Sequence, residues 1–330
     1  ARVPACVAMN DNGGAGSDGP THGLLVMAYG TPRSTADIES FYTHIRRGRA
    51  PEPQQLAELT ARYEALGGTS QLAANTAAQV EALRSSMDAD EPGSWVVALG
   101  QKHAAPFIED ATAELLASGV STVVGVVLAP HYSGASVGEY HRRARSVLDE
   151  AAAGAPGHGG APRYGAVDSW HLLEPWLAFQ GATLLDRLAT MPERTKVVFT
   201  AHSLPERSLV GDPYPDQLFE SAAEIARRAD LPRWAGWGIG WQSKGRTADP
   251  WRGPDVLEII EDLADTGRSD GLLVVPQGFT SDHLEVGYAL DIEARAAADR
   301  VGLAFARTKV PNADPAVMDG LARLARSQAP

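Results

Sequence analysis

The chain repeats one local pattern, first in LLVMAYGTP (residues 24–32) and again in VVFTAHSLP (residues 197–205). Each copy is an apolar run that ends in Ala and is followed by a polar ring, a small residue, one spacer and Pro. The pattern pairs Tyr29 with His202, each at the carboxyl end of a predicted strand. In open α/β sheets, ligands bind outside the carboxyl ends of the strands, so we expect these two rings to face one cleft.

A second pair of strand ends keeps the same register. Pro130 and Pro276 each follow a predicted strand, and Glu139 and Glu285 stand nine residues after them. The repeat therefore indicates two halves of similar topology, with chance similarity of strand ends as the alternative.

Short apolar runs alternate with segments of helical period that are rich in Ala, Glu, Arg and Leu. This alternation is typical of βαβ units, in which parallel sheets carry helices on both faces. The sequence thus predicts an α/β chain that divides near residue 190. The predicted strands are 23–28, 95–99, 122–129, 167–170, 196–201, 234–240, 271–276 and 302–306.

Composition limits the partners of this chain. Its 330 residues suggest about two domains, and its net charge of −12 argues against nucleic acid as a partner. Cys6 is the only cysteine, which excludes an internal disulfide, a cysteine zinc site and a four-cysteine iron–sulfur cluster. No apolar run reaches the length of a membrane span, so we expect no stable membrane insertion.

The amino end differs from the rest of the chain. Residues 10–20 read NDNGGAGSDGP, which is too polar and Gly-rich to fold alone. We expect residues 1–22 to form a disordered extension, with Met9 as the natural start. The apolar piece before it is too short for a signal-peptide core, which favours a cytoplasmic protein.

His202 is the clearest candidate for a residue with a chemical role. A histidine just past a buried strand can act as a metal ligand or as a base near neutral pH. The alternative is a loop histidine that donates to a backbone carbonyl.

The segment GFTSDHLEVGYALDIE (278–293) predicts a helix with Asp282 as its cap and Glu285 in its first turn. On a regular helix Glu285 and Glu293 share a face, whereas Asp291 lies off it. An acidic solvated face is the alternative. One imidazole and one carboxylate together suit a loosely held divalent metal ion.

Basic and aromatic residues gather elsewhere. Arg46, Arg47 and Arg49 form either a solvated helix end or a patch that binds carboxylates, and Arg62 and Tyr63 add a planar donor and an aromatic face.

Three rings follow or flank predicted strands. Tyr140 offers another aromatic donor, and we expect His103 and His131 to have structural or supporting roles. No Walker loop, GxGxxG, HExxH or GxSxG motif occurs, so nucleotide-binding, protease and hydrolase functions lack support.

Taken together, nine motifs resemble those of the ferrochelatase family, and the resemblance is strongest to its soluble bacterial branch, which uses coproporphyrin III. It covers the chain from about residue 23 to the carboxyl end. The motifs are AYGTP (28–32), YTHIRRGR (42–49), RYEALGG (62–68), SQLA (70–73), APHYS (129–133), AHSLPER (201–207), GDPYPDQL (211–218), GWQS (240–243) and GFTSDHLEVGY (278–288).

The resemblance implies two Rossmann-like domains, each doubly wound around a parallel four-stranded sheet, of similar topology around a porphyrin cleft. Residues 23–190 and 191–330 would form them. It implies a lyase of haem biosynthesis that inserts Fe²⁺ into coproporphyrin III and releases two pyrrole protons. Porphyrin and Fe²⁺ would then be substrates of a monomer without a permanently bound cofactor or iron–sulfur cluster.

The same resemblance assigns site residues. His202 and Glu285 match the family's catalytic and metal-site pair, and Tyr29 matches a position over the metal on the other porphyrin face. One feature departs from the family: Ala289 replaces the middle carboxylate of a ladder that runs outward, which leaves Glu293 and, off the face, Asp291 as outer acidic residues. The positions that match contacts to the macrocycle and its propionates are Arg46, Arg62, Tyr63, Ser70 and Tyr140.

Several alternatives stay open. Within the family, protoporphyrin IX could be the substrate, or the chain could be a cobalt chelatase of the same fold. From other classes, it could be a non-catalytic haem or porphyrin carrier with Tyr29 as axial ligand, or a two-domain binding protein for a metal chelate.

Overall fold

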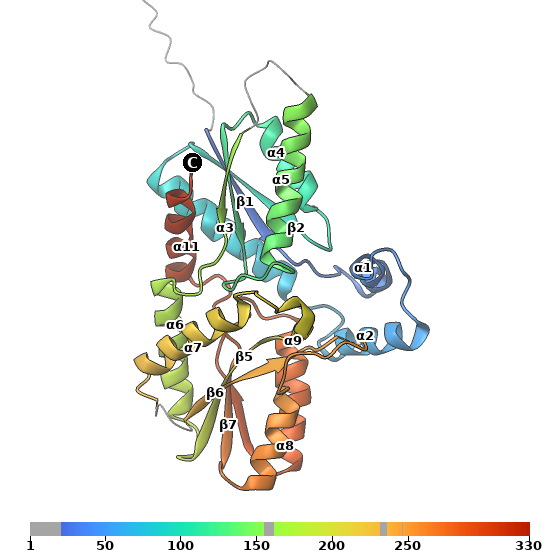
Figure 1. The fold of residues 1–330 in the computed structure, drawn as a ribbon, viewed down its shortest axis with the longest axis vertical. Coiled ribbons are helices and arrows are strands. Elements are labelled where there is room, and N and C mark those ends of the chain that lie inside the picture. Colours follow the sequence, from blue (N-terminus) through green and yellow to red (C-terminus); the bar gives the residue numbers. More distant parts are fainter. Residues whose placement is uncertain (1–20, 155–161, 232–235, 246) are drawn as a thin grey trace, which may run out of the picture.

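The computed structural model describes residues 21–154, 162–231, 236–245 and 247–330. Two parallel four-stranded sheets form its centre, one in each half of the chain (Figure 1). Their strand orders, β2-β1-β3-β4 and β6-β5-β7-β8, are the same topology used twice. The strands are β1 (His22–Ala28), β2 (Trp95–Gln101), β3 (Thr122–Val127), β4 (Arg163–Val167), β5 (Thr195–His202), β6 (Trp237–Gln242), β7 (Gly271–Val275) and β8 (Ala304–Arg307).

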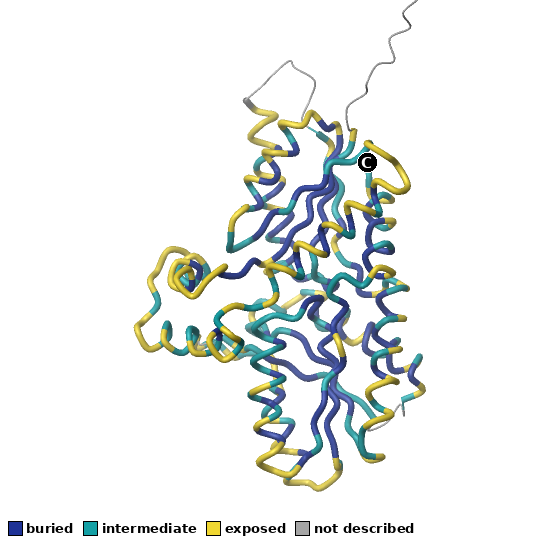
Figure 2. The backbone as a smooth tube through the Cα atoms, turned by 180° about the vertical axis from the view of Figure 1, so that it is seen from behind, coloured by how far each residue is buried: buried dark blue, intermediate teal, exposed yellow. Residues whose placement is uncertain are grey.

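Burial explains the apolar runs. Every residue of β3 (TVVGVV) and of β7 (GLLVV) is buried, as expected where helices cover both faces of a parallel sheet. Figure 2 shows both sheets as buried ribbons inside more exposed helices. The prediction of α/β halves with parallel four-stranded sheets is therefore confirmed.

Helices cover the two sheets and join the halves. Helix α11 packs against α3 and α6, and α6 also packs against α7 and β7. One apolar cluster consequently runs from Leu24 and Val124 in the first sheet to Phe199 and Leu273 in the second. The helices are α1 (Ile38–Ile45), α2 (Pro53–Ala65), α3 (Leu72–Asp90), α4 (Ile108–Ala117), α5 (Val137–Gly154), α6 (Glu174–Leu188), α7 (Tyr214–Arg228), α8 (Val256–Thr266), α9 (Leu284–Gly287), α10 (Arg295–Arg300) and α11 (Pro315–Ser327). Shorter turns are the 3₁₀ helices η1 (Thr35–Asp37) and η2 (Glu206–Ser208) and the π-helix η3 (Ala289–Ala294).

Helices α1 and α2 project to the side of the two sheets (Figure 1). The outer surface of this pair is largely exposed (Figure 2). This helix pair carries two of the predicted porphyrin contacts, Arg46 just after α1 and Arg62 within α2.

Two local predictions were wrong. The strand predicted at 167–170 is β4 at Arg163–Val167, because β3 pairs with this less apolar segment. The backbone of Trp170 instead donates to the carbonyl of Pro130, outside the ladder. The regular helix predicted within 278–293 is α9 followed by the π-helix η3.

The predicted amino-terminal extension differs at its end, because His22 already belongs to β1. Residues 1–20 of that extension lie outside the described residues, as do 234 and 235 of the predicted strand at 234–240.

Candidate active site

A cavity of about 310 Å³ opens at the carboxyl ends of both sheets. Tyr29, the residue after β1, and His202, the last residue of β5, both line it. The structure thus brings together the two rings that the sequence repeat pairs, as expected for this fold.

His202 and Glu285 form the ionisable part of the cavity. Nε2 of His202 lies 3.7 Å from Oε1 of Glu285. The Nδ1 atom of His202 lies 2.5 Å from the carbonyl oxygen of Ser203, to which only an N–H can donate. In the neutral imidazole, Nε2 therefore carries the free lone pair and can accept a proton or bind a metal ion.

The backbone of Glu285 is held by a hydrogen bond, whereas one oxygen of its carboxylate has no partner among the described residues. Its carbonyl accepts a hydrogen bond of 2.8 Å from Nε2 of Gln242, at the end of β6. Its Oε2 atom is buried and has no hydrogen-bond partner within the described structure. A buried carboxylate oxygen without a partner is costly, so this atom suits a proton or a cation delivered by a ligand.

The predicted pair does not belong to a larger cluster of possible metal ligands in the described structure. Among the described residues, no group of three or more His, Cys, Asp or Glu side chains could hold a metal ion. An imidazole and one carboxylate suit a metal ion that passes through the site more than one that is stored there.

Tyrosines and a lysine line the opposite part of the cavity. Burial against the cavity wall, and next the charge of Glu285, raise the pKa of Tyr29 well above its ordinary value, although 44% of this residue stays accessible from the open side. Burial also raises the pKa of Tyr140, whose ring lies 5.3 Å from Nζ of Lys102. Lys102 in turn pairs with Glu139 at 2.9 Å. This wall therefore presents uncharged hydroxyls at neutral pH.

Of the predicted porphyrin contacts, only Tyr29 and Tyr140 line this cavity, together with the pair His202 and Glu285. Tyr63 is buried beside it, 3.4 Å from Oγ1 of Thr31.

Ser70 and the two arginines lie further out. The hydroxyl of Ser70 is 3.0 Å from Oγ1 of Thr31. Arg46 donates to the side-chain oxygen of Gln55 at 2.9 Å, and Arg62 lies over the ring of Tyr288 at 5.1 Å.

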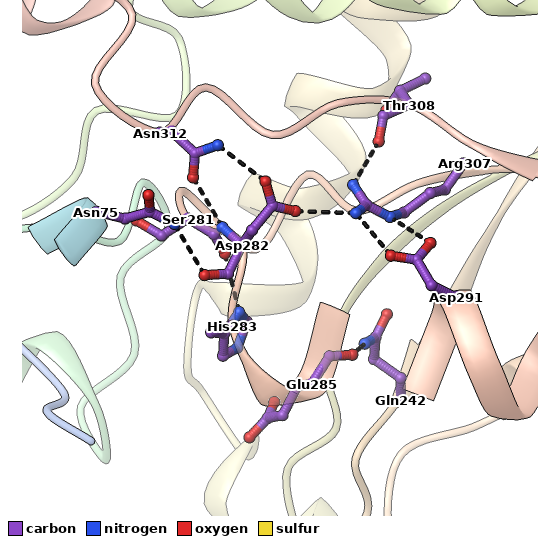
Figure 3. A network of polar contacts seen from close by, with 10 residues as sticks. All are labelled: Asn75, Gln242, Ser281, Asp282, His283, Glu285, Asp291, Arg307, Thr308 and Asn312. Atoms are coloured by element: carbon purple, nitrogen blue, oxygen red, sulfur yellow. Dashed lines mark hydrogen bonds and ion pairs between the residues drawn. The ribbon is translucent and has the colours of Figure 1, made fainter. Parts of the chain in front are cut away.

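The two outer acidic residues have different surroundings. Asp291 makes a double contact with Arg307, at 2.8 Å to each carboxylate oxygen, on the side away from the Glu285 carboxylate (Figure 3). The side chain of Glu293 has no hydrogen-bond or ion-pair partner in the described part of the chain. Its amide donates to the carbonyl of Tyr288, five residues back, so α-helical spacing does not set its face.

Sequence reasoning missed His283, which also lines the cavity. Its Nδ1 donates to the carbonyl of Ser281 at 2.9 Å, and burial lowers its pKa. The residue is extended at the N-cap of α9, two positions before Glu285. Its place in the SDHLEVG motif was the available signal.

Tyr214 was also missed as a site residue. It lines the cavity, and its hydroxyl donates to the carbonyl of His202 at 3.3 Å, which fixes the end of β5. Gln79 of α3 lines the cavity from the other half.

Comparison with known proteins identifies the family of this chain. The ferrochelatase family model matches residues 21–329. The chain belongs to the ferrochelatase family. It is 42% identical over 306 residues to coproporphyrin III ferrochelatase of Bacillus subtilis, which covers 91% of this chain and 95% of that protein. It is 40% identical over 308 residues to coproporphyrin III ferrochelatase of Geobacillus thermodenitrificans, covering 92% and 94%.

Two solved structures share the fold at low identity. SirB from Bacillus subtilis with Fe³⁺ matches with a TM-score of 0.53 and 13% identity, over 94% of this chain and 96% of that one. DR2241 from Deinococcus radiodurans matches with a TM-score of 0.52 and 16% identity, over 93% of this chain and 55% of that one.

The predicted resemblance and the predicted fold are thus confirmed. Among the described residues, no helix has the length and apolar character that crossing a bilayer requires.

Proposed function

We propose that this chain inserts Fe²⁺ into coproporphyrin III, releases the two pyrrole protons and so forms the iron porphyrin of haem biosynthesis. The observation that carries the proposal is the pair of His202 and Glu285, which lines a cavity shared by both halves and combines a free imidazole lone pair with a carboxylate oxygen that has no partner among the described residues. The names of its relatives support the choice of metal and porphyrin.

The reaction needs a base on one face of the porphyrin. Two N–H protons must leave as iron binds the four nitrogens, and Nε2 of His202 can accept them one at a time and pass them on. The carboxylate of Glu285, 3.7 Å away, stabilises the imidazolium formed in that step. Iron is the second substrate here, and these two side chains are its proposed contacts.

The other face needs hydroxyls that carry no charge. The hydroxyl of Tyr29 is protonated at neutral pH, as at the ordinary tyrosine pKa, and its raised pKa keeps it protonated at higher pH, so it does not compete with Glu285 for the cation. We assign Tyr29 to the side of the porphyrin opposite His202, with Tyr140 behind it. Contacts away from the metal would hold the ring in a bent geometry.

The arginines support a porphyrin with many carboxylates. Arg46 contacts the neutral amide of Gln55, and Arg62 contacts an aromatic ring, so neither guanidinium pairs with a carboxylate among the described residues. Each is available for a charge-assisted pair with a propionate. Tyr63 and Ser70, joined through Thr31, add neutral donors nearby. Coproporphyrin III has four propionates, whereas protoporphyrin IX has two.

The proposal includes a setting for the reaction. A substrate with four propionates stays in water, so we place the enzyme in the cytoplasm and expect it to act as a monomer. Size-exclusion chromatography with light scattering checks the monomer.

The test is direct. Purified protein is incubated under anaerobic conditions with Fe²⁺ and free-base coproporphyrin III, and the loss of the free-base absorption bands is followed. We expect enzyme-dependent conversion to the iron porphyrin. Tight porphyrin binding without conversion would instead identify a carrier, and conversion with Co²⁺ and an earlier tetrapyrrole only would identify a cobalt chelatase.

A further inference from the structure

Arg307, the last residue of β8, joins two carboxylates that stand nine positions apart in the chain. Its Nε and one terminal nitrogen donate to the two oxygens of Asp291 at 2.8 Å each. The same terminal nitrogen donates to Oδ1 of Asp282 at 2.9 Å. Figure 3 shows the guanidinium between the two aspartates.

Asp282 is itself a junction. Its Oδ2 accepts from the side chain of Asn312 at 2.8 Å, and its amide donates back to Asn312 Oδ1 at 2.8 Å. Its carbonyl accepts from Asn75 of α3 at 3.0 Å, so the first half of the chain also holds it. These contacts fix the side chain, the amide and the carbonyl of Asp282.

Glu285 lies inside the segment that Arg307 closes. The segment runs from Asp282, just before α9, to Asp291, inside the π-helix η3. A four-residue helix followed by a π-helix has little stability of its own, because short helices are marginal and π-turns are rare. Contacts from outside must therefore define where this segment places Glu285.

We propose that Arg307 is a positioning residue for Glu285, acting as a clamp on both ends of the segment from Asp282 to Asp291. The clamp keeps the Glu285 carboxylate at its distance from Nε2 of His202. The inference rests on the proposed function, because it assigns Arg307 a role in the step that Glu285 supports. Arg307 itself does not line the cavity.

A second arginine in the chain provides a matched control. Arg228 of α7 makes a double contact with Glu174, at 2.7 and 2.6 Å, and a single contact of 2.9 Å with Glu224. Its side chain is 23% exposed, against 18% for Arg307. The two arginines thus have the same pattern of contacts, but Arg228 joins α6 to α7 away from the cavity.

The experiment compares Arg307→Met with Arg228→Met in anaerobic iron insertion. We expect Arg307→Met to lower kcat at least tenfold while the KM for coproporphyrin III changes less than threefold. Arg228→Met should keep kcat within twofold of the unchanged chain. Arg307→Lys keeps the charge but loses the planar fork, so we expect partial rescue of kcat.

Two readouts separate positioning from general destabilisation. Thermal unfolding is measured for both methionine variants, and amide hydrogen exchange is followed by mass spectrometry over residues 284–292. We expect faster exchange in this segment for Arg307→Met and Arg307→Lys, with β5 unchanged. If Arg307→Met does not fold, Arg307→Lys and Asp291→Asn decide the question by the same kcat and exchange measurements.

The outcomes are distinguishable. Near-normal kcat in Arg307→Lys and in Asp291→Asn would overturn the clamp, as would equal losses in Arg307→Met and Arg228→Met. Failure of the unchanged chain to insert iron would overturn the proposed function instead. Exchange over residues 284–292 still tests the clamp in that case, and unchanged exchange in the Arg307 variants would reject it.

Discussion

The carboxyl end of β1 and the carboxyl end of β5 occupy equivalent places in two sheets of identical topology, yet they present opposite chemistry. The β1 end offers Tyr29, whose hydroxyl is protonated near neutral pH and whose pKa is raised further by burial and by Glu285. The β5 end offers His202, with a free Nε2 and a carboxylate 3.7 Å away. One fold, used twice, therefore builds one wall whose hydroxyl keeps its proton near neutral pH and one wall whose imidazole can accept a proton.

The two walls are also supported differently. Two residues after Tyr29, the hydroxyl of Thr31 contacts those of Tyr63 and Ser70. Behind Glu285 lies the charged network around Arg307 and Asp282. Neutral hydroxyls need little compensation, whereas a carboxylate close to a cavity needs a fixed backbone and neighbours that control its direction. This difference predicts how strongly each wall responds to mutation.

The largest expected effect is the loss of the proton-exchanging wall. We expect His202→Ala to lower the rate of iron insertion at least about 100-fold, since a general base contributes roughly 10²–10⁴-fold. The fold should stay intact, with a thermal midpoint within about 3 °C, because this side chain is 39% exposed and its one hydrogen bond goes to its neighbour Ser203. Stopped-assay kinetics and calorimetry measure the two quantities. Near-full turnover in His202→Ala would contradict the proposed mechanism.

The next effect separates the inner carboxylate from the outer one. We expect Glu285→Gln to lower kcat roughly 10- to 100-fold through the lost stabilisation of the imidazolium. Glu293→Gln should lower kcat less than about threefold, because Ala289 interrupts the ladder and Glu293 has no partner among the described residues. Steady-state kinetics on both variants gives the ratio. Equal losses would show that Asp291 or water completes the path despite Ala289.

Substrate choice tests the side of the cleft that carries the arginines. We expect kcat/KM for coproporphyrin III to exceed that for protoporphyrin IX by roughly tenfold or more, since one lost charged contact is worth about 1.5–3 kcal/mol. Both porphyrins are compared in detergent-free buffer, with separately solubilised protoporphyrin as the control. Equal efficiency would mean that Arg46 and Arg62 do not read propionates.

Much of the fold follows from local pattern. The eight strands alternate with helical segments, and seven of the eight predicted strands overlap their observed counterparts by more than one residue. The exception is β4, an edge strand whose sequence RYGAV is only partly apolar. This segment is a strand because it pairs with β3, whereas the residues that follow it form a loop. Apolar content alone cannot separate these two cases.

Part of the candidate site could also be predicted from local sequence pattern, and part could not. His202 and Glu285 were predictable because each stands at a strand end or helix start that the pattern marks. The role of Arg307 was not, because it lies 16 residues from Asp291 and 25 from Asp282, and only the position of β8 in the sheet brings it between them. The π-helix was equally hidden, since a single shift from four-residue to five-residue hydrogen bonds leaves no clear mark on the sequence.

The smallest expected effect concerns Tyr29, on the wall with the uncharged hydroxyls. If Tyr29 acts as an uncharged surface, Tyr29→Phe removes one hydroxyl and should change kcat by no more than about fivefold, the value of one neutral hydrogen bond. Its raised pKa lies above the ordinary value of about 10, so the hydroxyl stays protonated up to that pH. The profile of rate against pH between pH 6 and pH 10 should therefore keep its shape in Tyr29→Phe.

The raised pKa of Tyr29 also predicts how the stability of the folded chain changes with pH. The folded chain holds the phenolic proton more tightly than the unfolded chain, so this contribution is complete below pH 10 and is lost as the pH rises above it. Tyr29→Phe should consequently lose less stability between pH 9 and pH 11 than the unchanged chain does. Urea titrations at those two pH values measure the difference, and Tyr164→Phe, whose pKa burial also raises far from the cavity, is the control. An alkaline limb that appears or moves in the rate profile of Tyr29→Phe would show that the hydroxyl exchanges a proton during the reaction, and the contrast between the two walls would fail.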